Sequence, residues 1–584
     1  MREAKIQSEA LKNKAMPKIR GWKRGLNNAR WLHILFPIVI GLISFLIIYG
    51  VTPLDVQNDH WIMAGYDESD IIQHYAGWIS FRNSDWSYPL GLASDMAVED
   101  GTFISYTDSI PWIAIFFKCI RSILPKTFQY FGIYTLVCYV LQSIAAFEII
   151  EYKTGSMAFS SIATFLLTFA PIEMERAFRH TALGSQWFIL FAILLFIKHK
   201  ENYRAIHYLG FTVLMILAIG IHPYFLPAIG IFLLLCVIED LKRKRIQSTF
   251  YMVGILALTY VSGTIIGVLG TGVSPSRWGY GYFSMNLNAI LNPTSCGGYT
   301  WSSFLKTYPQ ILGNYDGFNY FGVGVIFAGL LSLILTICTD TKKISLRIKK
   351  YAWEIIMLFG CTVFAVSNVV TFNDRTIVEI PLPEWMQLLC GIFRASSRIF
   401  YPVYYCLIFY IIVRIWRLVS KYGKIKSIIV ISIIVIVQII DIHSVIIEKH
   451  VRMLENSEYV SILDDETLGI ILQDGQDILL DSFNGDSRSI AVAAGKNGCR
   501  LYYSVANSGS YERTSIKAAE LVSYIKQTGD IGKHIVVTTD WNIIKDYLHF
   551  DGIGYYRNGD SYYIAQNAEG RLSSSADGYT ASNE

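Results

Sequence analysis

Long apolar segments recur along most of this chain and constrain its fold more than any other feature. A helix that crosses a bilayer needs about 20 mostly apolar residues. Only 16% of the residues are charged, against about 25% in a typical soluble domain. The sequence therefore predicts an all-α polytopic membrane bundle of about 11 transmembrane helices, near 32–51, 128–150, 156–172, 184–198, 206–221, 223–239, 249–270, 319–338, 352–372, 401–417 and 427–445.

The orientation of this bundle depends on segment 109–124. It is short, contains Lys118 and Arg121 and ends before Pro125, so an interfacial or re-entrant helix fits better than a crossing. Without that crossing, the basic loops all lie on the side of the N-terminus, as the positive-inside rule requires; these are 198–204, 241–245, 342–350 and 421–426. We therefore expect the N-terminus in the cytoplasm and the C-terminus outside, in a multi-pass protein of the plasma membrane.

Composition divides the chain into four parts. From about residue 450 short apolar runs alternate with helix-like stretches, which predicts a small extracytoplasmic α/β domain. The predicted parts are a basic cytoplasmic N-terminus at 1–31, a transmembrane domain at 32–449 with a large first outer loop at 52–127, the α/β domain at 450–566, and a Ser/Gly-rich disordered tail at 567–584.

Acidic residues collect in the first outer loop, where 52–108 holds ten acids and one base, Arg82. A helix starting near Glu68 would place Asp70, Gln73 and His74 on one face. Carboxylates at a helix start can also simply cap it, which remains an alternative for Asp67 more than for Asp70. Arg82 either pairs with one of the acids or binds an anionic ligand.

Two other outward segments carry clustered cations. Arg176, Arg179 and His180 are spaced to share a helical face, and Arg394 and Arg398 stand four residues apart before a span. Arginine suits bidentate phosphate contacts, so these residues could hold a lipid-linked phosphate. The alternative is contact with ordinary headgroups.

Three further residues qualify these assignments. Glu173 and Glu175 are close enough in sequence to neutralise Arg176 and Arg179. His222 lies between two predicted spans, where a lone histidine serves structure more often than chemistry. The nine cysteines form no C-x-x-C pair or metal-binding pattern.

Six short blocks carry a family resemblance. The chain resembles the GT-C superfamily of membrane glycosyltransferases and, within it, a bacterial family of predicted polytopic glycosyltransferases. The blocks are DIIQHYAGWISFR (70–82), WSYPLG (86–91), YTDSIPW (106–112), RHTALGSQW (179–187), HPYF (222–225) and FRASSRIFYP (393–402).

The resemblance implies an enzyme of cell-envelope polysaccharide biosynthesis that moves a sugar from a polyprenyl-phosphate donor to a hydroxyl on a glycan, lipid or protein acceptor, with inversion. A first-loop acid would be the general base, with Asp70 the first choice and Asp67 the second. Mg²⁺ or Mn²⁺ is an optional cofactor. The expected substrate-binding residues are Glu68, Gln73, His74, Arg82, Arg179, His180, His222, Arg394 and Arg398.

Two other functions compete with this prediction: a flippase or transporter of lipid-linked glycans, and a non-catalytic cell-envelope assembly protein. Transporters tend to place ionisable groups inside spans near the bilayer midplane. Here the acids collect in one outer loop, which favours an enzyme. The net charge of +4 does not indicate a nucleic-acid partner.

Overall fold

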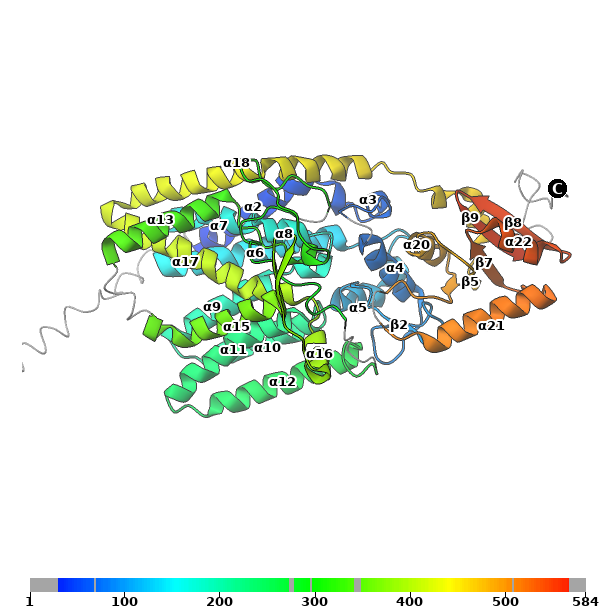
Figure 1. Ribbon diagram of the computed structural model, residues 1–584, viewed down its shortest axis with the longest axis horizontal. Helices are drawn as coiled ribbons and strands as arrows, with labels where there is room; N and C mark the ends of the chain where they lie inside the picture. Colours follow the sequence, from blue (N-terminus) through cyan, green and yellow to red (C-terminus); the bar gives the residue numbers. More distant parts are fainter. Residues whose placement is uncertain are drawn as a thin grey trace, which may run out of the picture.

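The computed structural model describes residues 30–566 except 68–69, 273–277, 295–296, 341–347 and 507–508. The predictions for Glu68, for most of the basic N-terminus and for the tail at 567–584 therefore lie outside the described residues. The molecule is mostly helical, and a helical bundle and a small sheet occupy opposite ends of its long axis (Figure 1).

Each of the eleven predicted spans contains one helix. These are α2 (Arg30–Tyr49), α6 (Phe131–Thr154), α7 (Met157–Thr168), α9 (Trp187–Glu201), α10 (Ile206–Ile219), α11 (Phe225–Lys242), α12 (Gln247–Ile266), α13 (Val323–Asp340), α15 (Ala352–Val366), α17 (Tyr401–Val419) and α18 (Lys424–Asn456). Among the described residues, six helical stretches are long and apolar enough to cross a membrane, and four apolar helices are shorter, at 10–17 residues. Eleven crossings therefore remain a prediction.

Two predicted boundaries are wrong. The helix expected at 352–372 ends at Val366, because Ser367 adopts φ 68° and the chain continues as β3 (Val369–Phe372), paired antiparallel with β4 (Arg375–Glu379). Later in the chain, α18 continues to Asn456, past the predicted end of its span at 445 and the predicted domain boundary at 449.

The first outer loop folds into short elements: η1 (Thr52–Leu54), α3 (His60–Met63), α4 (Asp70–Asn83), β1 (Leu92–Ala93), β2 (Thr102–Phe103), α5 (Pro111–Cys119) and η2 (Arg121–Ile123). Segment 109–124 thus holds one helix of nine residues. At 1.5 Å per residue it is about 14 Å long, well short of the roughly 30 Å hydrocarbon core. This length is consistent with an interfacial helix.

The short connecting elements between the later spans position several functional side chains. They are α8 (Pro171–Arg176), η3 (Thr181–Gly184), η4 (Asn314–Gly317), α16 (Glu384–Gly391) and η6 (Ser396–Phe400). α8 contacts η3, and η4 contacts η6. His180, directly before η3, reaches the first loop at Asp70.

The C-terminal region contains the expected α/β domain. Its five-stranded sheet has the order β6-β5-β7-β9-β8, in which β6, β5 and β7 are parallel and β9 and β8 antiparallel. The strands are β5 (Asp477–Leu480), β6 (Arg500–Leu501), β7 (His534–Thr538), β8 (Ile553–Asn558) and β9 (Ser561–Gln566), and the larger helices are α20 (Ser487–Lys496), α21 (Glu512–Thr528) and α22 (Trp541–Leu548).

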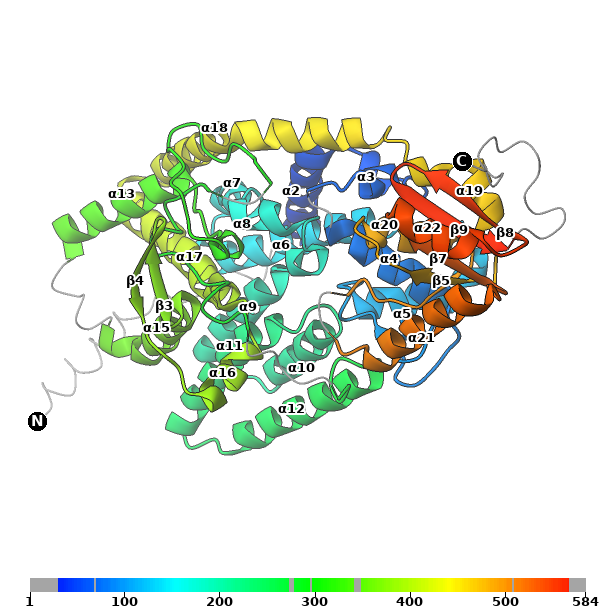
Figure 2. The same ribbon diagram turned by 45° about the vertical axis from the view of Figure 1, so that its right-hand side comes forward.

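Helix α20 attaches this domain to the first outer loop, since it packs directly on α4 (Figures 1 and 2). The approach is close enough that a Cβ on Gly495 would lie 2.7 Å from Ile79. Asn83 donates a 2.5 Å hydrogen bond to the Gly495 carbonyl. Lys496 forms a 2.6 Å ion pair with Asp59.

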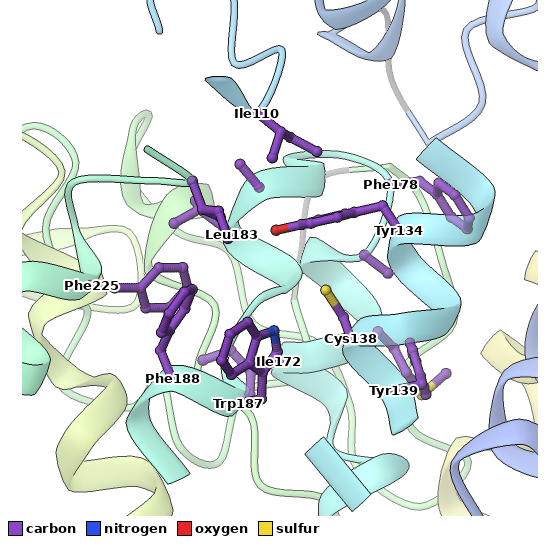
Figure 3. Close-up of a cluster of buried hydrophobic side chains, with 14 of the residues drawn as sticks. Ile110, Tyr134, Cys138, Tyr139, Ile172, Phe178, Leu183, Trp187, Phe188 and Phe225 are labelled. Atoms are coloured by element: carbon purple, nitrogen blue, oxygen red, sulfur yellow. The ribbon is translucent and has the colours of Figure 1, made fainter. Parts of the chain in front are cut away.

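A buried aromatic and aliphatic core supports this end of the bundle. Figure 3 shows side chains of α6, α8, α9 and α11 gathering below Ile110, the residue that precedes α5. Tyr134 is held by a hydrogen bond to Ser185, on the η3–α9 connection. The loop that carries Ile110 therefore packs on a buried hydrophobic core.

An ion pair buried in this region joins the first loop to α18. Lys449 and Asp67 lie 2.7 Å apart with both side chains 1% exposed. Asp67 also accepts a hydrogen bond from Tyr299, and its φ of 63° lies in the left-handed region. Removing one member of a buried pair leaves an uncompensated charge, whereas replacing both does not.

We expect Lys449→Met to lower the free energy of unfolding by about 3–5 kcal/mol. The double variant Asp67→Asn with Lys449→Met should recover most of that loss, measured by denaturant unfolding in detergent. Lys242→Met is the control, because its pair with Glu239 is on the surface and should contribute about 1 kcal/mol or less. Equal losses in Lys449→Met and Lys242→Met would contradict the buried pair.

Candidate functional site

Asp316 on η4 is a buried carboxylate that binds side chains from two other short elements of the bundle, α8 and η6. Arg398 binds it bidentately, with Nε 3.1 Å from Oδ2 and Nη2 2.8 Å from Oδ1. Arg176 donates to Oδ1 at 3.0 Å and to the Asp316 carbonyl at 2.6 Å, and Ser397 adds a 3.0 Å bond to Oδ2. α8, η4 and η6 are thereby fixed around one anion that has two cationic partners.

Asp70 lies beside this cluster as the first residue of α4. Its carboxylate is 3.9 Å from His180 Nε2 and 3.8 Å from Arg488 Nη1, and 28% of its side chain is exposed. Arg488 belongs to α20 and also pairs with its own N-cap residue, Asp486, at 2.9 Å. The first outer loop and the C-terminal domain therefore both contribute charged groups to one site.

A second acid, Asp108, reaches the same site from the loop before α5. Its carboxylate is 3.8 Å from His222 Nε2. Because His222 Nδ1 accepts a 3.3 Å hydrogen bond from the Tyr224 amide, its proton is assigned to Nε2, facing Asp108. Asp108 and Ile110 both have positive φ, at 55° and 54°, which is uncommon outside glycine and a strained conformation for a β-branched residue.

The loop that carries Asp108 is held tightly on α4. Ser109 donates a 2.7 Å hydrogen bond to the His74 carbonyl, and Tyr130 donates to the Ser109 carbonyl. Gly77 makes this approach possible, since a Cβ there would overlap the hydroxyls of Thr107 and Ser109. The position of Asp108 thus follows from a glycine in the middle of α4.

Burial and neighbouring charges set the protonation states. Burial raises the pKa of Asp108 to about 7; the charge of Asp70 raises it as well, while Arg398 and Arg394 oppose the shift. Burial lowers the pKa of His180 and of His222 well below the usual value, and Arg398 lowers both further. At neutral pH the two imidazoles are neutral, and Asp108 is divided between its two forms.

The arginines predicted to hold phosphate differ in how they are paired. Arg398 is engaged by Asp316, and Arg179 forms an ion pair with Glu175. Arg394 is half-buried against the rings of Trp278 and Phe283, and it forms no ion pair with any described residue. Arg394 is therefore the cation of this set best placed to meet an external anion.

Three other predicted residues are buried or bound to backbone carbonyls. Gln73 and His74 are buried at 1% exposure, and neither ring nitrogen of His74 has a hydrogen-bond partner among the described residues. Burial lowers the pKa of His74 to about 3. Arg82 donates to four backbone carbonyls at 121–126, so it neither pairs with a loop acid nor faces Asp70.

The acids do not form a metal site among the described residues. No group of three or more His, Cys, Asp or Glu side chains is arranged to hold an ion there. Asp67, the second choice for the general base, is occupied by Lys449 and Tyr299. Mg²⁺ or Mn²⁺ therefore remains a prediction.

The charges around Asp108 lead to an expectation for its titration. Asp70→Asn should lower the pKa of Asp108 from about 7, because it removes a nearby negative charge, and Arg394→Gln should raise it, because it removes a positive one. Infrared difference spectra of the carboxyl band across pH would report both shifts, with Asp108→Asn as the blank. Unchanged midpoints in both variants would contradict this arrangement.

Comparisons with known proteins place the chain in a family. No curated protein matches it. Among solved structures, the archaeal oligosaccharyltransferase AglB of Archaeoglobus fulgidus, in complex with an inhibitory peptide and a dolichol-phosphate, aligns with 9% identity and a TM-score of 0.38, over 92% of this chain and 74% of that one. A TM-score of that size supports no structural argument. The family model described as a domain of unknown function, DUF6311, matches residues 38–443, so the chain belongs to the DUF6311 family.

Proposed function

We propose that this protein is a membrane glycosyltransferase that moves a sugar from a polyprenyl-phosphate donor to an acceptor hydroxyl, with Asp70 as the general base. The observation that carries the proposal is the meeting of two acids, Asp70 and Asp108, with an arginine that has no carboxylate partner among the described residues, Arg394. Such a site offers both a proton acceptor and a cation for a departing phosphate.

The chemistry follows from these groups. The acceptor oxygen attacks the anomeric carbon while its proton passes to the Asp70 carboxylate. The bond between that carbon and the phosphate oxygen breaks, and its electron pair leaves with polyprenyl phosphate. Arg394 would stabilise the charge developing on that phosphate. A single displacement of this kind inverts the anomeric centre.

The other charged groups have supporting roles in this proposal. Arg488 and His180 lie within 4 Å of the Asp70 carboxylate, so they hold it in place. Asp108, with a pKa of about 7, is a second proton acceptor next to His222. The Asp316 cluster is internally paired, so we assign it to structure.

Asp70→Asn tests the proposal directly. In membranes that contain the native acceptor, release of polyprenyl phosphate from labelled polyprenyl-phosphate hexoses should fall roughly 10²- to 10⁴-fold, the usual contribution of a general base. Asp85→Asn is the matched control, because Asp85 is an exposed acid of the same loop and its loss should leave the rate unchanged.

Two outcomes would overturn the assignment. Equal release by wild type and Asp70→Asn would show that Asp70 is not the base. If wild type moved a labelled lipid-linked glycan between leaflets of a proteoliposome without releasing polyprenyl phosphate, the flippase alternative would replace the enzyme.

A further inference from the structure

A polar pocket lies between the first outer loop and the C-terminal domain. It has a volume of about 290 Å³, and its walls come from the end of α4, from η2 and the residues after it, and from the end of α20. Four cations line it: Arg82, Arg121, Lys126 and Lys496. None of the described residues that line it is acidic.

The charge of this pocket is mostly uncompensated. Lys496 is paired with Asp59, which is itself buried, but no described carboxylate forms an ion pair with Arg82, Arg121 or Lys126. The two guanidiniums are close enough that Arg121 contributes to lowering the pKa of Arg82, after the larger effect of burial. Three positive charges therefore face one small cavity.

Backbone carbonyls orient these side chains without neutralising them. Both Nη atoms of Arg82 donate hydrogen bonds to backbone carbonyls. In Arg121 only Nη1 does so, to the carbonyls of residues 82–84. Lys126 donates one hydrogen bond, of 3.0 Å, to Asn497 Oδ1. Since a guanidinium has five N–H donors and an ammonium three, Arg121 and Lys126 both retain donors for a ligand.

We propose that this pocket binds a phosphate group, carried either by an anionic lipid headgroup or by a soluble phosphate such as inorganic phosphate. A tetrahedral oxyanion accepts from several donors at once and suits a mixed Arg and Lys set. Ile123, between the lining residues Ser122 and Leu124, is 78% exposed, as expected where a protein meets the lipid interface.

This pocket is separate from the candidate active site. Arg82 and Asp70 are 12 residues apart on α4, about 18 Å at 1.5 Å per residue. A phosphate bound here would contact α4, η2 and α20 together. Its binding is therefore coupled to docking of the C-terminal domain, independently of any sugar transfer.

The test uses the purified full-length protein and two probes. Inorganic phosphate is titrated calorimetrically into the protein in a nonionic detergent, and phosphatidylglycerol adducts are counted by native mass spectrometry after extraction from vesicles of phosphatidylglycerol and phosphatidylcholine. Lys126→Gln should weaken binding of at least one probe roughly tenfold, since it removes one charge-assisted hydrogen bond. Lys126 is exposed, so this variant should fold.

Two further variants define the site. Asn497→Asp places a negative charge beside Lys126 and should weaken binding comparably. Lys545→Gln, an exposed cation of the same domain that lies on α22 and does not line the pocket, should bind both probes as wild type does.

The outcomes separate the sources of the phosphate. A loss confined to inorganic phosphate identifies a soluble ligand, and a loss confined to phosphatidylglycerol identifies a headgroup; both support the pocket. No binding of either probe to wild type, equal binding to wild type and Lys126→Gln, or equal weakening in Lys545→Gln would overturn it.

Discussion

Asp316 accepts hydrogen bonds from two arginines on separate segments, and the geometry of the candidate site depends on it. A buried carboxylate between two guanidiniums is costly to assemble, and losing the carboxylate would leave two unpaired cations in a dry environment. Burial alone would raise the pKa of Asp316, but Arg176 and Arg398 hold it well below its usual range. The cluster thus holds α8, η4 and η6 together and leaves one net positive charge next to Asp108 and His180.

The remainder of the site is built by parts of the chain far apart in sequence. α4 supplies Asp70, the loop before α5 supplies Asp108, and α20 supplies Arg488 more than 400 residues after Asp70. Docking of α20 on α4 creates two features at the two ends of α4: the site around Asp70 and the cationic pocket around Arg82. The C-terminal domain therefore contributes residues to both the candidate site and the cationic pocket.

Local sequence patterns predicted much of the fold, because the length of an apolar segment and the spacing of charged residues along it depend only on neighbouring positions in the chain. The eleven helices, the short helix at 109–124 and the C-terminal α/β domain were all accessible in this way. The pairing of residues was not. Asp67 was a candidate base in the sequence, and only the fold shows that Lys449 lies beside it. Arg82 was predicted to bind an anionic ligand at the site, and only the fold shows the backbone carbonyls that surround its guanidinium.

The residues that sequence missed have the same explanation. Asp108 stood in the YTDSIPW block, but nothing local indicated its approach to His222. Asp316 and Arg488 sit in segments without a recognisable pattern, and each acquires its role through partners more than 80 residues away. One signal was present for Asp108: it is the only acid in the YTDSIPW block.

Chemical crosslinking tests the central claim, that the two ends of the chain build one surface. Lys126 Nζ lies 3.0 Å from Asn497 Oδ1, and Lys126 is exposed. In the Asn497→Asp variant, a zero-length carbodiimide should join these two side chains in native membranes, and mass spectrometry should recover a peptide linked between positions 126 and 497. Crosslinks from position 497 only to lysines of its own domain would contradict the account.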